Sequence, residues 1–287
     1  MTMDAGSLVL QHQDARLVVA PQSGGMIRAF QWQGEDILRP APPGTPDDPF
    51  AAACFPMVPF VNRIAHGRFS FGGRTVRLRQ NWSEDPHPIH GQGWRAIWRV
   101  TAASETSATL KFEGGGDEWP WRYGCEQRLR LFPDALSIEL SIENLGAAPM
   151  PAMLGLHPYF PGAGRAQLRA RLPRVWLTDA AALPLEETAT PPAWLFEPPR
   201  SVQAVSLDHC FCGWSGHASL EWPGRTVSVR ALNCPYLHVY APAGRDFFCI
   251  EPQTGAPGSL GRNGGETSVL APGGQMTIEV QLHVTAH

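Results

Sequence analysis

The sequence predicts a large antiparallel β-sandwich with few or no long helices, and three observations support this fold class. Apolar residues recur at every second position in several segments, as expected for strands with one buried and one exposed face. The 29 glycines and 28 prolines are spread over the whole chain of 287 residues, so helices would be interrupted at short intervals. With 43% hydrophobic residues and 10 tryptophans, the chain can build a sizeable core.

The strand pattern can be followed along the chain as a series of hairpins and strand pairs. Each pair is separated by a short turn signal, and the last segment is a single alternating strand. The segments are 69–78 with a turn at Gly72-Gly73, 96–113 as two strands about Ser104-Glu105, 129–142 with a turn at Pro133-Asp134, 220–229 with a turn at Pro223-Gly224, and 276–284. Such a number of strands must stack as two sheets or close a barrel to protect their edges.

The chain is predicted to be one domain covering residues 1–287. All-β sandwiches often reach roughly 200–250 residues in one piece, so the length allows this. Two stretches rich in loop-forming residues, Pro40–Pro49 and Pro184–Pro199, are too short and too apolar to be convincing linkers between domains.

Charge and composition exclude several classes of function. The 23 Lys and Arg residues against 26 Asp and Glu give a net charge of −3, which argues against nucleic acid or another polyanion as a partner. The longest stretch without polar side chains, Pro49–Val61, is far shorter than the roughly 20 residues of a spanning helix. We expect no membrane partner, no secretory signal and a cytoplasmic location.

Cysteines and nucleotide motifs narrow the chemistry further. The six cysteines are scattered, which in a reducing compartment predicts free thiols in or near the core. Cys210-Phe211-Cys212 lacks a second pair at zinc-ligand spacing, so a metal role for it is disfavoured. The chain contains no glycine-rich dinucleotide or phosphate loop and no serine-hydrolase elbow motif.

Four polar clusters interrupt the apolar strand pattern at proline or glycine, where strand ends and loop mouths usually carry functional sites. They are Asn62-Arg63-Ile64, His87-Pro88-Ile89-His90-Gly91, Gly155-Leu156-His157-Pro158-Tyr159-Phe160 and Glu251-Pro252-Gln253-Thr254. Taken singly, each cluster is more often an ordinary loop with solvated side chains. The proline after His157 and after Glu251 favours extended backbone there, which helps to aim a side chain.

Glu251 is the least ordinary of these residues. The run Phe247-Phe248-Cys249-Ile250 leads directly into it, so a carboxylate ends an apolar strand, where losing water is costly without a partner. A histidine and a glutamate of shifted pKa that face one cavity would form an acid/base pair able to work in both directions near neutral pH.

Five segments together resemble, in sequence order, the motifs of the aldose 1-epimerase (galactose mutarotase) family, over roughly residues 15 to 285. They are Asn62-Arg63-Ile64 with Gly67-Arg68-Phe69, His87–Gly91 with Trp94 and Trp98, Leu156-His157-Pro158-Tyr159-Phe160, Leu207-Asp208-His209, and Glu251-Pro252-Gln253-Thr254. The resemblance implies a β-sandwich of the galactose-mutarotase type, with the sugar in an open cleft on one sheet. It also implies a small monosaccharide as partner and no metal or organic cofactor; we expect a monomer or homodimer.

By the same resemblance, His157 is the general acid that protonates the ring oxygen of the pyranose, and Glu251 is the base that takes the proton of the anomeric hydroxyl. The ring opens to the free aldehyde, the C1–C2 bond rotates, and reclosure with the roles reversed gives the other anomer. Four residues, Asn62, Arg63, His90 and Asp208, are implied to bind the sugar and to help fix charge at the site.

Some features depart from the family pattern or surround it. The family often has an Asn-containing segment after the Glu251 motif, whereas Gly255–Gly265 here is rich in glycine, so the identity of the sugar stays open. Three histidines beside the motifs do not fall on the acid position, and we expect His66, His87 and His209 to be structural or exposed.

Three alternatives remain. A hexose-6-phosphate epimerase on the same fold would need further arginines at the cleft, for which Arg95, Arg122 and Arg245 are candidates. A non-catalytic sugar-binding sandwich would have lost the acid or the base, and both are present. A metal-dependent isomerase would use His87, His90, His157 and Glu251, although residues three apart on a strand, such as His87 and His90, point to opposite faces.

Overall fold

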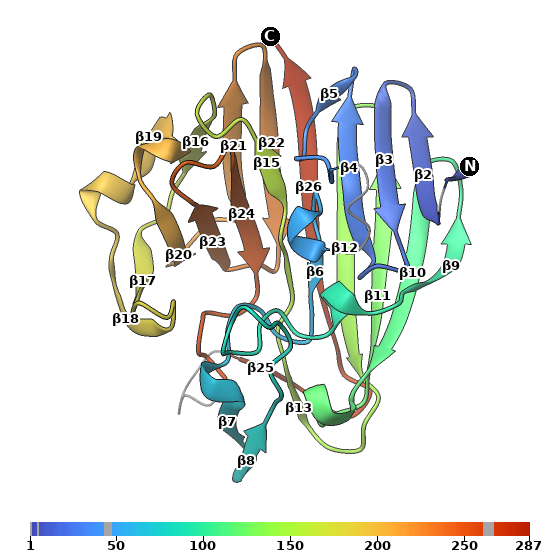
Figure 1. Cartoon of the computed structure of the whole chain (residues 1–287), viewed down its shortest axis with the longest axis vertical. Helices are drawn as coiled ribbons and strands as arrows, with labels where there is room; N and C mark the ends of the chain where they lie inside the picture. The colour runs from blue at the N-terminus through green and yellow to red at the C-terminus, as the bar shows by residue number, and fades with distance from the viewer. Residues whose placement is uncertain (1, 5, 43–47, 261–266) are drawn as a thin grey trace.

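The structure, a computed structural model, describes residues 2–4, 6–42, 48–260 and 267–287. These residues form strands joined by loops, and their helices are short 3-10 turns (Figure 1). The turns are η1 (Pro49–Ala51), η2 (Ala65–Gly67), η3 (Gly93–Arg95), η4 (Gly116–Glu118), η5 (Pro192–Trp194) and η6 (Val202–Ala204). Among the described residues, no helix has the length and apolar character that crossing a bilayer requires.

A nine-stranded antiparallel sheet forms one layer of the molecule. In spatial order its strands are β19 (Phe196–Ser201), β16 (Gln167–Ala170), β21 (His217–Trp222), β22 (Arg225–Leu232), β26 (Gln275–Ala286), β12 (Ala135–Asn144), β11 (Tyr123–Leu131), β10 (Ser107–Gly114) and β9 (Arg99–Ala103).

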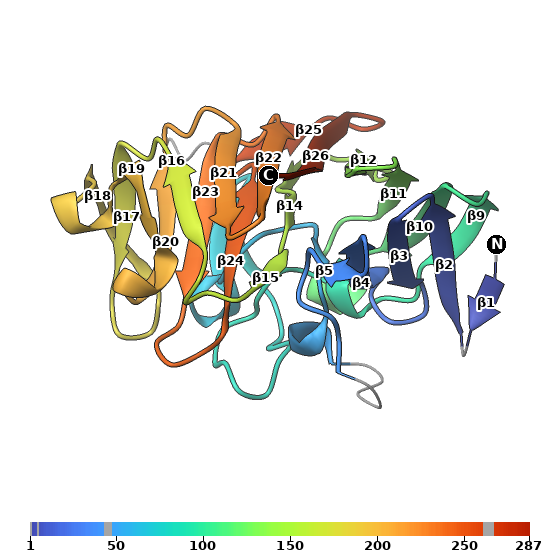
Figure 2. The ribbon, with the colours of Figure 1, turned by 90° about the horizontal axis from the view of Figure 1, so that it is seen from above.

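Two further sheets lie side by side opposite this layer (Figure 2). The larger sheet has the order β18 (Pro184–Ala189), β17 (Arg174–Thr178), β20 (Leu207–Cys212), β23 (Tyr236–Ala241), β24 (Phe247–Gln253), β14 (Gly155–Leu156) and β6 (Pro56–Met57), with β15 (Tyr159–Pro161) also paired to β24. The smaller sheet runs β1 (Thr2–Asp4), β2 (Ser7–His12), β3 (Ala15–Ala20), β4 (Met26–Trp32) and β5 (Glu35–Asp36). A bridge between Ile27 and Cys54 joins the smaller sheet to the segment just before β6. Two small hairpin-like pairs complete the fold, β7 (Arg68–Phe71) with β8 (Arg74–Arg77) and β13 (Met150–Ala152) with β25 (Ser268–Leu270).

The core lies between the layers and follows from the alternation of the strands. In β12, Leu136, Ile138, Leu140 and Ile142 are buried, and Ile138 lies opposite Val280 of β26. The residues between them, including a line of charged side chains, point to the outer face of the nine-stranded sheet. One sequence period therefore builds both the core and a polar outer surface.

The predicted antiparallel β-sandwich is confirmed. The hairpin about Pro133-Asp134 is β11 and β12, the one about Gly72-Gly73 is β7 and β8, and the one about Pro223-Gly224 is β21 and β22. Segment 96–113 contains β9 and β10, and all six cysteines are free and buried, as expected. The assignment of a single domain stays a prediction.

Two local expectations differ from the structure. The loop-rich stretch Pro184–Pro199 contains β18 and the start of β19. Both are the outermost strands of their sheets, where proline is tolerated because no neighbouring strand needs its missing N–H. Glu251 does not end its strand, because β24 continues through Pro252 to Gln253. In the other stretch, Pro40–Pro49, residues 43–47 lie outside the described part of the chain.

Candidate active site

Strand register places the predicted acid and base side by side on one face of the larger sheet of the second layer. β23 pairs with β24 so that His238 lies opposite Glu251. On the other side of β24, Tyr159 lies opposite Cys249, so His157, two residues before Tyr159, is level with Glu251. Neighbouring strands thus bring three titratable side chains from distant parts of the sequence into one row.

Two loop segments bring Asn62 and His90 to the same place. Both residues have left-handed backbones, with φ of 53° and 57°, and the His90 N–H donates to the Asn62 carbonyl oxygen at 3.1 Å. Gly91 allows this close packing, because its φ is 75° and a Cβ there would lie 2.1 Å from the carbonyl oxygen of Val58.

An open pocket of about 140 Å³ collects these groups. All six residues expected from the sequence line it, namely Asn62, Arg63, His90, His157, Asp208 and Glu251. Aromatic side chains form part of its wall, with Phe50 and Trp82 in contact at a ring-centroid distance of 4.4 Å, and Tyr159 and Tyr240 beside the row of titratable groups. Polar groups next to apolar rings suit a sugar, which has hydroxyl groups and apolar C–H faces.

His157 and Glu251 are in direct contact. The His157 Nε2 atom lies 3.2 Å from Glu251 Oε1, and the two side chains are only 7% and 3% exposed. The imidazole packs against the rings of Phe55 and Tyr159, at centroid distances of 4.5 and 4.6 Å. These two stacking contacts fix the plane of the ring, and its Nδ1 is buried without a partner in the described structure.

Burial shifts the pKa values of His157 and Glu251 in opposite directions. It lowers the pKa of His157 to about 3, helped by the charge of His238, and it raises the pKa of Glu251 to about 7 against the opposing effect of His238. Between about pH 3 and pH 7 the pair therefore holds one titratable proton, on the Glu251 carboxyl, and both side chains are uncharged.

A second network holds Asp208 in place. The Asn62 side-chain oxygen accepts the Arg63 N–H at 2.8 Å, so the Asn62 amide nitrogen faces His238 Nδ1 at 3.3 Å. The His238 Nε2–H donates to Asp208 Oδ1 at 2.8 Å, and in the neutral imidazole Nδ1 is the acceptor for the Asn62 amide. Each side chain in this chain of contacts thereby fixes the orientation of the next.

Charges in this network are also tuned by neighbours. Burial lowers the pKa of His238, but Glu251 and Asp208 together raise it by more. Burial raises the pKa of Asp208, yet the hydrogen bond from His238 and the charges of His238 and Arg63 together outweigh it and hold the pKa at about 2. Asp208 is therefore a carboxylate at any physiological pH, with Oδ2 left for another donor.

Arg63 and His90 complete the charge distribution of the pocket. Arg63 Nε donates to Asp85 Oδ2 at 2.6 Å, so most of its charge is balanced within the protein. Burial, together with His157 and Arg63, lowers the pKa of His90, which keeps this imidazole neutral.

Sequence reasoning did not include His238 or Asp85 in the site. His238 carried a usable signal, because it is a titratable residue in the middle of the otherwise apolar and aromatic run Tyr236–Tyr240. Such a residue in a buried strand needs a partner. Asp85 gave no signal, because an aspartate in a loop is ordinary.

The remaining sequence candidates lie away from the pocket. His209 packs against Trp194 with the rings tilted. His87 Nδ1 accepts the His66 N–H at 3.1 Å, and His87 does not line the pocket that holds His90, His157 and Glu251, so the four ligands of the metal-dependent alternative are not gathered together. Arg95 pairs with Glu118, and Arg122 lies 3.8 Å from Glu113. These two arginines and Arg245 do not line the pocket. In the glycine-rich segment Gly255–Gly265, Gly261 to Gly265 lie outside the described residues.

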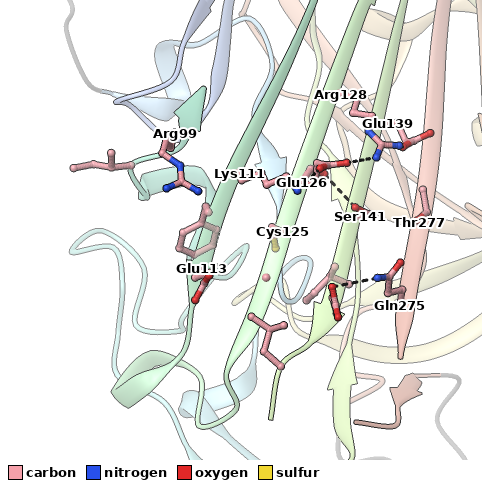
Figure 3. Close-up of a pocket in the computed structure, with 16 residues that line it drawn as sticks. Arg99, Lys111, Glu113, Cys125, Glu126, Arg128, Glu139, Ser141, Gln275 and Thr277 are labelled. Carbon is pink, nitrogen blue, oxygen red and sulfur yellow. Dashed lines mark hydrogen bonds and ion pairs between the residues drawn. The ribbon is translucent and has the colours of Figure 1, made fainter. Parts of the chain in front are cut away.

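A larger hollow exists on the outer face of the nine-stranded sheet, and we call it the outer groove (Figure 3). Its volume is about 660 Å³, and charged side chains of β10, β11 and β12 line it. Lys111 pairs with Glu126 at 2.8 Å, and Arg128 bridges Glu126 and Glu139 at 2.5 and 2.7 Å. These charges are partly exposed and satisfy one another, so the outer groove lacks the buried acid/base pair that chemistry would need.

Comparison with known proteins shows what this chain is similar to. The sequence profile of the family described as aldose 1-epimerase matches residues 6–283. The Escherichia coli K12 protein YphB is 33% identical over 288 aligned positions, which cover 96% of this chain and 97% of YphB.

Solved structures show the same arrangement of strands. A candidate aldose 1-epimerase of Escherichia coli K12 superposes with a TM-score of 0.91 at 31% identity, covering 98% of this chain and 99% of the other. A galactose 1-epimerase of Lactobacillus acidophilus NCFM superposes with a TM-score of 0.82 at 17% identity, covering 98% and 94%, which shows a shared fold.

Proposed function

Because the chain belongs to the aldose 1-epimerase family, we propose that it interconverts the α and β anomers of a free aldose by cofactor-free acid/base ring opening and reclosure. The observation that carries this proposal is the contact between His157 Nε2 and Glu251 Oε1, which lie 3.2 Å apart and both line an open pocket. Two groups at hydrogen-bond distance from each other can both reach the ring oxygen and the anomeric hydroxyl, which are bonded to one carbon.

The reaction moves two protons and no electrons. In ring opening, imidazolium His157 gives its proton to the ring oxygen while carboxylate Glu251 takes the proton of the anomeric hydroxyl. The pair is left as neutral imidazole and carboxylic acid. Rotation about C1–C2 turns the aldehyde, and reclosure from either face returns the proton to His157. Each positioned proton transfer typically contributes a factor of about 10²–10⁴.

The two protonation states of the pair serve the two directions of the reaction. Ring opening needs the charged pair, ring closure needs the uncharged pair, and both hold the same single proton. The exchange between them is therefore internal to the site. Burial favours the uncharged pair, and the burial-induced pKa values of about 3 and about 7 support this as the resting state.

Asp208, Arg63 and His90 are proposed to bind sugar hydroxyls around the reacting carbon. Asp208 keeps one carboxylate oxygen free while His238 holds the other. The carboxamide of Asn62 is engaged on both sides by protein groups, which supports a role in orienting His238 and Arg63 more than in direct contact with sugar. Tyr240 and Trp82 offer ring faces to the sugar C–H groups.

The hexose-6-phosphate alternative finds less support in the charge of the pocket. A phosphate group carries nearly two negative charges and favours arginines that are free to bind it. Among the described residues lining the pocket, Arg63 is the arginine present, and Asp85 already balances it. Asp208 adds a negative charge nearby. These features favour an uncharged sugar.

Polarimetry of freshly dissolved sugars tests the proposal. We expect the protein to accelerate the relaxation of α-D-glucose or α-D-galactose well beyond the spontaneous rate, and to act less on the matching 6-phosphates. A panel of aldoses run in parallel would identify the preferred sugar. Absence of acceleration with every aldose would overturn the catalytic proposal and leave a sugar-binding protein. A cytoplasmic location and a monomeric or homodimeric state remain expectations from the sequence.

A further inference from the structure

Cys249 lies beside the acid/base pair and has no part in the proposed reaction. Cys249 and Glu251 are two residues apart on β24, so their side chains point to the same face. One ligand atom each from His157, Cys249 and Glu251 lies within 4.8 Å of the other two. All three side chains are buried. Among the described residues, this is the one cluster of three or more potential metal ligands.

We propose that His157, Cys249 and Glu251 form a binding site for a thiophilic divalent cation, Zn²⁺ or Cd²⁺, and that a cation bound there inhibits the enzyme. Imidazole nitrogen, thiolate sulfur and carboxylate oxygen are the three donor types that Zn²⁺ takes from proteins. With bond lengths of about 2.0–2.3 Å in a tetrahedron, ligand atoms are about 3.6 Å apart. Closing the present spacing, which is at most 4.8 Å, to this value requires the ligand atoms to move by about 1 Å.

The surroundings favour a soft cation over a hard one. Mg²⁺ and Ca²⁺ select sites made of oxygen atoms, whereas the thiol of Cys249 suits Zn²⁺ and Cd²⁺. The carboxylate of Asp208 lies close by, and the charge of Arg63 is balanced by Asp85. Arg39, the other nearby cation, is stacked on Tyr159 and donates to main-chain carbonyl groups.

Three protein ligands leave the fourth coordination position to water. Inhibition rests on the proposed function, because the cation would occupy the same nitrogen and carboxylate that exchange protons with the sugar. Binding itself does not rest on it. Binding releases protons to solvent: the thiol of Cys249 gives up its proton as the sulfur–metal bond forms, and the Glu251 carboxyl, where it is protonated, gives up its own.

Cadmium absorption tests whether the site binds a cation, and zinc inhibition tests whether a bound cation stops the reaction. Chelator-treated full-length protein is titrated with Cd²⁺, and the ultraviolet charge-transfer band of a cadmium thiolate is recorded; Zn²⁺ affinity is measured by calorimetry. Cys249→Ser removes the proposed sulfur ligand. Cys125→Ser is the matched control, since Cys125 is also buried, lies on β11 and is outside the cluster. Mutarotation is followed with and without Zn²⁺, each variant being compared with its own metal-free rate.

We expect one Cd²⁺ per chain with a thiolate band in the wild type and in Cys125→Ser. In Cys249→Ser we expect loss of the band, Zn²⁺ affinity weaker by roughly tenfold or more, and a matching resistance to Zn²⁺ inhibition. An unchanged band or affinity in Cys249→Ser, or no stoichiometric binding by the wild type, would overturn the site.

A competition experiment on the wild type needs no variant and covers the case in which Cys249→Ser does not fold. A saturating sugar that is a substrate should weaken Cd²⁺ binding, and an unchanged Cd²⁺ affinity would contradict overlap of the two sites. Cd²⁺ binding with no mutarotation of any aldose would refute the proposed function and leave the metal site standing.

Discussion

The pocket around the acid/base pair and the outer groove contain the same types of charged residue in opposite surroundings. In the pocket, Glu251 is 3% exposed and its partner is a neutral imidazole. In the outer groove, Arg128 is 49% exposed and shares its charge between Glu126 and Glu139 (Figure 3). The groove has the larger volume, yet among the described residues that line the two sites, the carboxyl and imidazole groups with strongly shifted pKa values lie in the pocket. Burial, more than composition or cavity size, separates reactive carboxylates from structural ones.

The energy scale explains this difference. One unit of pKa shift corresponds to about 1.36 kcal/mol of differential interaction between two protonation states, and burial shifts both members of the pair by more than one unit. An exposed ion pair contributes only about 0–1 kcal/mol, because water and salt screen it. Substitutions in the two regions should therefore have effects of very different size.

The largest effect is expected from Glu251→Gln. The amide keeps the shape of the side chain but cannot accept the proton of the anomeric hydroxyl, so kcat should fall by about 10²–10⁴-fold. Polarimetric relaxation of the preferred aldose measures this, with circular dichroism to confirm folding. Glu139→Gln in the outer groove is the matched control and should keep the wild-type rate. Equal rates for Glu251→Gln and wild type would remove Glu251 from the mechanism.

The next largest effect is expected from pH. The raised pKa of Glu251, about 7, means that the pair loses its single proton above this pH, and no proton is then left for the ring oxygen. We expect kcat/KM to fall about tenfold per pH unit above pH 7. The lowered pKa of His157, about 3, places the acid limit near pH 3, below which the pair holds two protons and neither group can accept the proton of the anomeric hydroxyl.

Initial rates at low sugar concentration, corrected for spontaneous mutarotation and taken with a chelator present, measure this profile. An activity that rises as the pH passes 7 would contradict the one-proton scheme. It would mean that ionised Glu251 works beside a neutral His157.

A smaller effect is expected from Asp208→Ala. This change removes a charged hydrogen-bond acceptor of the sugar, and such bonds contribute about 1.5–3 kcal/mol, so KM should rise by roughly 10- to 100-fold. The change in kcat should be smaller, because His157 and Glu251 remain in contact. Steady-state kinetics of the preferred aldose separates the two parameters. An unchanged KM would exclude Asp208 from sugar binding.

How far the sequence could predict each region also differs. Alternation over 136–142 and 276–284 was enough to place β12 and β26, since a period of two has one physical meaning in a half-buried strand. Residues of the site were identifiable through the family motifs. Their contact was not, because the pairing of Tyr159 with Cys249 is a long-range register that no local pattern encodes.

His238 shows what local reasoning leaves out. Its role depends on three partners from three distant segments, Asn62, Asp208 and Glu251, and the strand that carries it looks like ordinary core. The ion pairs of the outer groove are equally invisible in the sequence. Not knowing the partners in advance matters little in the groove, because exchanging one exposed ion-pair partner for another changes the free energy of unfolding only slightly.

The smallest effect is therefore expected from Lys111→Met in the outer groove. Lys111 is 51% exposed and pairs with Glu126, which keeps Arg128 as a second partner, so the free energy of unfolding should change by less than about 1 kcal/mol. Mutarotation should stay at the wild-type rate. Urea denaturation at low and high salt measures the first quantity, and the small difference between variant and wild type should shrink further in high salt, because screening weakens exposed pairs. A large loss of activity in Lys111→Met would instead show that the outer groove takes part in function, and the contrast between a buried reactive pair and an exposed structural ladder would no longer hold.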